Sequence, residues 1–257
     1  MTDTEDDVSD AIRLFNEAFY RSDPADYFRT KLLLLLVTGA KPKELSDLLA
    51  GGLSYENVRF VVPEAAEETP SSDEDLKRFI VIESQALLHH AAESTLRLYL
   101  AHASQSLTPW VELADMRRPG ELKRQVEDVF IASEPDPRLV AWVCLGQSAP
   151  PPDIEVQRWN EAVEGIGAFL RRLARAFLDD APLYNAIKHG LGVSPGQAEL
   201  LIDSMQMGSG PSIDFPEFTK WHAEGVGTEV RDINLRTRWI DVSEALGLVE
   251  IAVRLID

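Results

Sequence analysis

The chain has 257 residues, 45% of them hydrophobic, and a formal net charge of -18. This length suffices for one sizeable hydrophobic core, so a globular protein is expected, and the negative charge argues against an extended groove for duplex DNA. Cys144 is the single cysteine, which excludes a disulfide framework and is typical of a reducing cytosol. The acidic N-terminus and the absence of a long apolar run predict a cytoplasmic protein that does not enter a membrane.

Residues 1–62 predict a helical N-terminal section. VSDAIRLFNEAFYR carries apolar residues at helical spacing, Pro24 suits the start of a second helix, and KPKELSDLLAGG indicates a third. The second helix contains the apolar run 32–37, which is far shorter than a membrane span and predicts a buried helix. In SYENVRFVV, the alternation of Val58, Phe60 and Val62 predicts a short strand.

Residues 63–75 predict a solvated acidic linker, because acids, prolines and serines leave almost nothing to bury. Residues 76–257 then predict a helical bundle domain. The helix expected over 76–103 contains neither glycine nor proline for about eight turns and is apolar on most faces, so it should lie in the middle of the bundle. Two shorter helices follow it, over GELKRQVEDVFIA and PRLVAWVCLGQ. A second long helix is then expected over VQRWNEAVEGIGAFLRRLARAFLDD.

The sequence pattern changes from helical to strand-like after Gly190. In TEVRDINLRTRWI, Val230, Ile233 and Leu235 alternate with charged residues, which predicts a strand hairpinned with ELLIDSM near residues 198–240. A last helix is expected over DVSEALGLVEIAVRLI. The predicted fold class is therefore mainly α, a helical bundle with a small C-terminal β-hairpin.

The best candidate for a site is LYNAIKHGL, residues 183–191. Asn185, Lys188 and His189 are three and four residues apart, so they project from one face of a helix, and Gly190 suits the C-cap position. Such a face carries positive charge and can donate and accept protons. The alternative is that Lys188 and His189 are simply favourable residues for the last turn of a short helix.

A polar stripe on the helix over 76–103 offers partners for this cluster. Its members recur at helical spacings: Glu83, His90, Glu93, Ser94 and Arg97. A buried polar group without a partner costs about 1 to 3 kcal/mol. We therefore expect Glu83 or Glu93 to pair with Lys188, and His90 to approach His189. A buried polar network with a purely structural role is the alternative reading.

The letters YNAIKH at residues 184–189, late in a helical bundle, resemble the HEPN superfamily, helical domains that include many ribonuclease toxins and inactive relatives. Its active members carry RNxxxH, in which the arginine holds or polarises the scissile phosphate and the histidine is general acid or base. Asn185 and His189 match this motif, but Tyr184 stands in place of the arginine, and Lys188 supplies charge without the fork of arginine.

The resemblance covers residues 73–257 at most. It implies a protein without standard ribonuclease activity that binds RNA, a nucleotide or a protein partner, and it implies a homodimer. Two other functions stay open, namely a structural or interaction protein whose polar network only fixes helix register, and a weak hydrolase that uses His189 with Glu93 or Glu83.

Basic clusters indicate either a solvated helical face or a small anion site. They are Arg117, Arg118, Lys123 and Arg124, and then Arg171, Arg172 and Arg175. No cofactor is expected, because the chain has no glycine-rich nucleotide-binding loop. No metal is expected either, because the histidines have no companions at ligand spacing.

Overall fold

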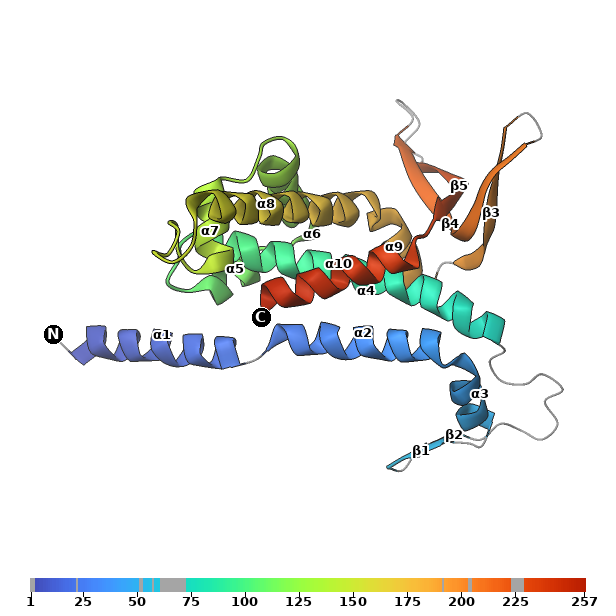
Figure 1. Ribbon diagram of the computed structural model, residues 1–257, viewed down its shortest axis with the longest axis horizontal. Coiled ribbons are helices and arrows are strands. Elements are labelled where there is room, and N and C mark those ends of the chain that lie inside the picture. Colours follow the sequence, from blue (N-terminus) through green and yellow to red (C-terminus); the bar gives the residue numbers. More distant parts are fainter. Residues whose placement is uncertain are drawn as a thin grey trace. The chain divides into compact units, whose positions relative to one another are not determined.

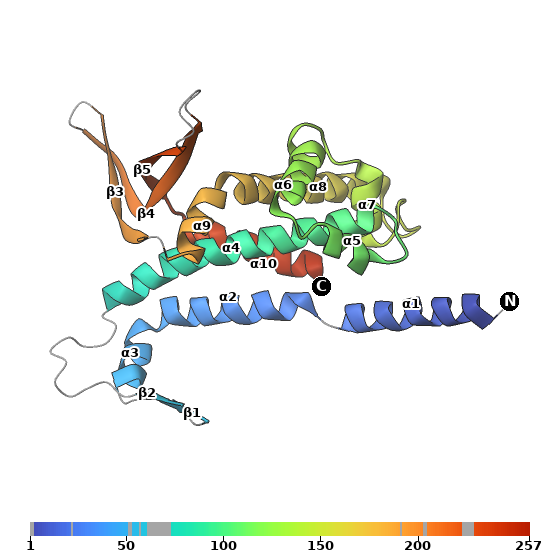
Figure 2. The same ribbon diagram turned by 180° about the vertical axis from the view of Figure 1, so that it is seen from behind.

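The computed structural model describes residues 3–21, 23–50, 53–56, 58–60, 73–190, 192–202, 205–222 and 229–257. The chain is mainly helical with a small antiparallel sheet near its C-terminus, so the predicted fold class is confirmed (Figure 1, Figure 2). In the described ranges, no helix combines the length and the apolar character that crossing a membrane requires.

The chain forms two compact units. Unit 1 contains Met1–Phe28, His89–Ala181 and Leu248–Asp257, and unit 2 contains Arg29–Leu88 and Pro182–Gly247. The predicted division into residues 1–62, 63–75 and 76–257 stays a prediction, because residues 61–72 lie outside the described part of the chain.

The N-terminal section is helical, as expected. It consists of α1 (Asp3–Arg21), α2 (Pro24–Ala40) and α3 (Pro42–Ala50). Asp23 helps to start α2, because its carboxylate accepts a hydrogen bond of 2.9 Å from the backbone N–H of Ala25. The strand expected after α3 is a short antiparallel hairpin of β1 (Leu53–Tyr55) and β2 (Val58–Phe60).

The prediction of a buried second helix is correct for one side of α2 and wrong for the other. The buried side carries Ala25, Phe28, Leu32 and Leu35. Outside that buried side, Leu33, Leu34, Leu36 and Val37 are between 47 and 62% exposed. Residues 32–37 place apolar side chains on every side of the helix, whereas the described chain packs against only one side of it.

Unit 1 is built on the C-terminal half of α4 (Asp73–Ala103), the long helix predicted from the sequence. The elements that follow are α5 (Pro109–Asp115), α6 (Pro119–Val126), the π-helix η1 (Glu127–Ile131), α7 (Pro137–Leu145) and α8 (Val156–Asp179). The ring centroids of His89 on α4 and Phe177 on α8 are 5.1 Å apart, and those of Tyr99 and Phe130 are 5.3 Å apart. These contacts hold α4 against α8 and η1, and both views show α4 and α8 side by side (Figure 1, Figure 2).

Unit 2 contains a sheet of β3 (Ser194–Ile202), β4 (Met205–His222) and β5 (Glu229–Trp239), in the order β3-β4-β5. The predicted hairpin missed the central strand β4. Its Gly210, Pro211 and Pro216 are residue types that strands disfavour, since proline cannot donate to the ladder. Ile213 and Phe215 alternate within it and are buried, which anchors the strand despite its prolines.

The core of unit 2 joins the base of this sheet to α9 (Ala181–Lys188). Its buried members are Val81, Leu183, Ala186, Ile213, Phe215 and Ile240. The backbone N–H of Ile240 donates to the carbonyl oxygen of Pro211 at 2.8 Å, so the end of β5 is tied to β4. The chain then enters α10 (Val242–Ile256), the last predicted helix.

Candidate functional site

The short helix α9 presents the predicted polar cluster on its outer face. Leu183 and Ala186 are buried in the unit 2 core, whereas Asn185, Lys188 and His189 are all exposed. At about 100° per residue, the exposed three fall on the side of the helix opposite the buried two. The expected common face is therefore present, and it is a solvent face.

The end of α9 is the cap expected from the sequence. Gly190 has a φ of +62°, in the left-handed region that glycine enters without strain. The backbone N–H of His189 donates to the carbonyl oxygen of Asn185 at 3.0 Å, and that of Gly190 donates to Ile187 at 3.2 Å. The last turn is thus closed, which fixes the directions in which Lys188 and His189 project.

Lys188 and His189 form no ion pair with another residue of the described chain. In particular, the expected pairing of Glu83 with Lys188, two described residues of unit 2, is absent. Tyr184, which stands where the HEPN motif has arginine, is partly buried. The cluster therefore offers a lysine, an imidazole and an amide to solvent without a bidentate cation beside them.

The polar stripe on α4 is present and partly buried, and two of its charged members, Glu93 and Arg97, pair with each other within unit 1. The Arg97 guanidinium donates from Nη2 and Nε to Oε1 of Glu93, at 2.8 and 3.1 Å, and from Nη1 to the carbonyl oxygen of Met116 at 2.6 Å. His90 and Glu93 belong to unit 1, whereas His189 and Lys188 belong to unit 2. The predicted approach of these side chains stays a prediction.

Sequence reasoning missed a pair of side chains in unit 1, Tyr20 and His102. The Nδ1 of His102 lies 2.8 Å from the carbonyl oxygen of Leu98, which can only accept, so Nδ1 carries the proton. Nε2 of His102 lies 2.9 Å from the Tyr20 hydroxyl, at hydrogen-bond distance. The two residues are 82 positions apart in the sequence, so no local spacing could have joined them.

Tyr20 and His102 both line a cavity of about 660 Å³. Most of the lining is apolar, and Tyr99 and Cys144 are among its polar groups. Burial raises the pKa of the Cys144 thiol to about 11. Burial is the largest cause that raises the pKa of the Tyr99 phenol, and the nearby Cys144 and Asp136 raise it further. Both groups stay protonated at neutral pH, so the cavity holds no thiolate nucleophile.

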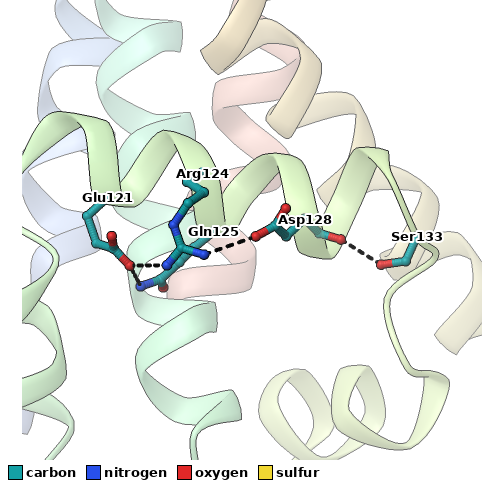
Figure 3. Close-up of polar contacts among 5 residues, drawn as sticks. All are labelled: Glu121, Arg124, Gln125, Asp128 and Ser133. Atoms are coloured by element: carbon teal, nitrogen blue, oxygen red, sulfur yellow. Dashed lines mark hydrogen bonds and ion pairs between the residues drawn. The ribbon is translucent and has the colours of Figure 1, made fainter.

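One member of the basic cluster near α6, Arg124, is paired with carboxylates. Arg124 donates to Glu121 at 2.6 Å and to Asp128 at 3.3 Å, and the Ser133 hydroxyl donates to the backbone carbonyl of Asp128 (Figure 3). The hydrogen bond to Glu121 raises the pKa of Arg124, and hydrogen bonds from Gln125 and Arg124 lower that of Glu121. A guanidinium held between two carboxylates is a poor anion receptor.

Within the described ranges, no group of three or more histidine, cysteine, aspartate or glutamate side chains is placed to hold a metal ion. The chain matches no protein-family model, no curated protein and no solved structure.

Proposed function

We propose that this chain is a HEPN-like protein that binds the phosphate groups of a single-stranded RNA or a nucleotide through Asn185, Lys188 and His189, without standard ribonuclease activity. One observation carries the proposal. These three side chains share the exposed face of α9, while its other face is held in the unit 2 core. The motif YNAIKH and the mainly helical fold support the family assignment.

Each member of the cluster has a role that its chemistry allows. The Lys188 ammonium is a point charge that suits a phosphate oxygen, and the Asn185 amide donates to phosphate or sugar oxygens. His189 donates from either ring nitrogen when it is protonated. Since Lys188 and His189 have no ion pair to break, and the core holds their backbone in place, binding requires little rearrangement.

The same geometry argues against efficient cleavage. The last carbonyl groups of α9 give this end of the helix a partial negative charge, so anion binding depends on the side chains alone. Tyr184 is neutral and partly buried, and it cannot hold a phosphate with two parallel hydrogen bonds as an arginine does. We therefore infer a weak binding site in which His189 acts as a ligand for phosphate.

The binding test uses fluorescence anisotropy with a labelled single-stranded oligouridine. Lys188→Ala should weaken binding about tenfold, the value of one charge-assisted hydrogen bond. Arg158→Ala is the matched control, because it removes one exposed positive charge from α8 in unit 1. Equal affinity of the wild type, Lys188→Ala and His189→Ala would reject the site and favour a structural role for the cluster.

The cleavage test compares RNA turnover by the wild type and by His189→Ala after matching their folded fractions by circular dichroism. We expect the same background in both. A turnover that His189→Ala abolishes would show that the protein is an active nuclease or hydrolase, and the binding-only function would be wrong.

A further inference from the structure

Helix α2 has an apolar side that nothing in the described chain covers. We call Leu33, Leu34, Leu36 and Val37 the α2 patch; each is about half exposed, with values between 47 and 62%. A helix that is hydrophobic all round belongs in an interior. Ala25, Phe28, Leu32 and Leu35 already bury the other side. Leu33, Leu34 and Val37 point away from that side and Leu36 borders it, so most of the patch is a second apolar face.

The α2 patch gathers several large apolar residues in one exposed place. Leu36 and Val37 lie three and four residues after Leu33, and Val37 lies three after Leu34, so the four side chains form one continuous area over little more than a turn of helix. Tyr27 on α2 and Leu48 on α3, with 52 and 56% exposed, add to the apolar surface of these two helices. Contiguous apolar surfaces of more than a few hundred Å² are rare on monomers and mark interaction sites.

The charges at the two ends of α2 indicate which partner fits. Asp26 lies within about 40° of Leu33 and Val37 around the helix axis, so an exposed acid precedes the patch on the same side. Lys41 directly follows the helix and is exposed, with its ammonium 2.9 Å from Glu44. Residues 26 and 41 are equally distant from the midpoint between Leu33 and Leu34.

A second copy of α2, packed antiparallel about that midpoint, matches this pattern. It covers apolar residues with apolar residues and sets Asp26 of each copy beside Lys41 of the other. A parallel pair would set like charges side by side. We propose that the α2 patch is the interface of a two-fold symmetric dimer of this chain, with its two α2 helices antiparallel. This proposal does not depend on nucleic-acid binding.

The first experiment is sedimentation velocity on the full chain over a range of concentrations. The wild type should dimerise, and Leu33→Asp or Val37→Asp should raise the dissociation constant at least about a hundredfold, because an acid is then buried in an apolar contact. Leu107→Asp is the matched control, since Leu107 is 80% exposed and lies outside α2. A wild type that stays monomeric, or a dimer that neither patch variant weakens, would overturn the proposal.

The second experiment leaves the apolar residues intact and tests the orientation. D26K alone and K41D alone should each weaken self-association about tenfold, because like charges then face each other at both ends. An equimolar mixture of the two should form a heterodimer, and D26K/K41D in one chain should restore self-association. If the mixture shows no preference for the heterodimer, the antiparallel arrangement is wrong.

Discussion

Arg97 and Arg254 form the same kind of ion pair in different surroundings. Each binds a glutamate four residues earlier, Glu93 at 2.8 Å and Glu250 at 2.6 Å. The first pair has only 20 and 29% of its side chains exposed, whereas the second has 75 and 55%. Arg97 also donates to the carbonyl oxygen of Met116, at the end of α5, so it links two helices of unit 1.

We expect Arg97→Ala to lower the free energy of unfolding by about 2 to 3 kcal/mol, because Glu93 and the Met116 carbonyl lose their shared donor in a partly buried place. Arg254→Ala should cost less than about 0.5 kcal/mol, as exposed pairs do. Urea denaturation of both variants measures the difference. Similar losses in the two would mean that Arg97 has no linking role.

The thiol of Cys144 should react slowly. Burial raises its pKa from 9.0 to about 11, so at pH 8 the thiolate fraction is about a hundredfold smaller than in an unfolded chain. Because the folded pKa is the higher one, the stability that this group contributes is complete below about pH 9 and is lost as pH rises toward about 11.

Alkylation by iodoacetamide at pH 8 tests this expectation for Cys144. The rate in the native protein should be at least about a hundredfold below the rate in urea, since burial also restricts access of the reagent. Equal rates would show that the thiol is exposed and that its surroundings differ from those described.

At the scale of secondary structure, α9 separates stabilising residues from candidate binding residues along one turn. Leu183 is 2% exposed and lies in the unit 2 core, whereas Asn185 faces solvent. We expect Leu183→Ala to lower the free energy of unfolding by about 2 to 5 kcal/mol, the cost of a buried cavity. Asn185→Ala should change it by less than about 0.5 kcal/mol. A large loss in Asn185→Ala, measured by urea denaturation, would assign that residue a structural role.

Helical elements were largely predictable because their signals are local. Period and caps predicted the long helix α4, the start of α2 at Pro24 and the glycine cap of α9. The same period predicted that Asn185, Lys188 and His189 share a face, but not that this face is exposed. The central strand β4 was not predictable, because Pro211 and Pro216 are residues that strands disfavour. The strand is stabilised by pairing with β3 and β5 and by the core.

Long-range contacts could not be predicted, because the residues that form them are far apart in the sequence. The Tyr20–His102 pair joins two helices that are distant in the sequence, and Arg97 binds a carbonyl beyond the end of its own helix. The sequence correctly predicted that α4 carries polar residues in need of partners. It did not indicate that Glu93 would find one on its own helix.

At the scale of the whole molecule, the two units are not consecutive stretches of chain. Unit 1 combines three segments and unit 2 combines two, and α2, α4 and α10 each begin in one unit and end in the other. A linear division such as 1–62, 63–75 and 76–257 follows composition along the chain. Composition alone cannot indicate that one helix contributes to two units.

The net charge of -18 gives a distinctive expectation for RNA binding at Lys188. A polyanion approaching this protein is repelled by the net charge at long range and attracted by Lys188 near α9, and salt screens the long-range part over about 10 Å at 0.1 M. Raising salt from about 50 to about 200 mM should therefore increase the association rate constant of the oligouridine, whereas basic nucleic-acid-binding proteins lose affinity steeply over this range. Stopped-flow anisotropy measures this rate, and an oligomer with an uncharged backbone, whose rate should not respond to salt, is the control.

The variant Lys188→Ala should show the same rise of the association rate with salt, because most of the overall electrostatic field is unchanged. Its complex with the oligouridine should dissociate faster, because one contact is lost. An association rate that falls with salt would mean that RNA meets a larger basic surface than the α9 face.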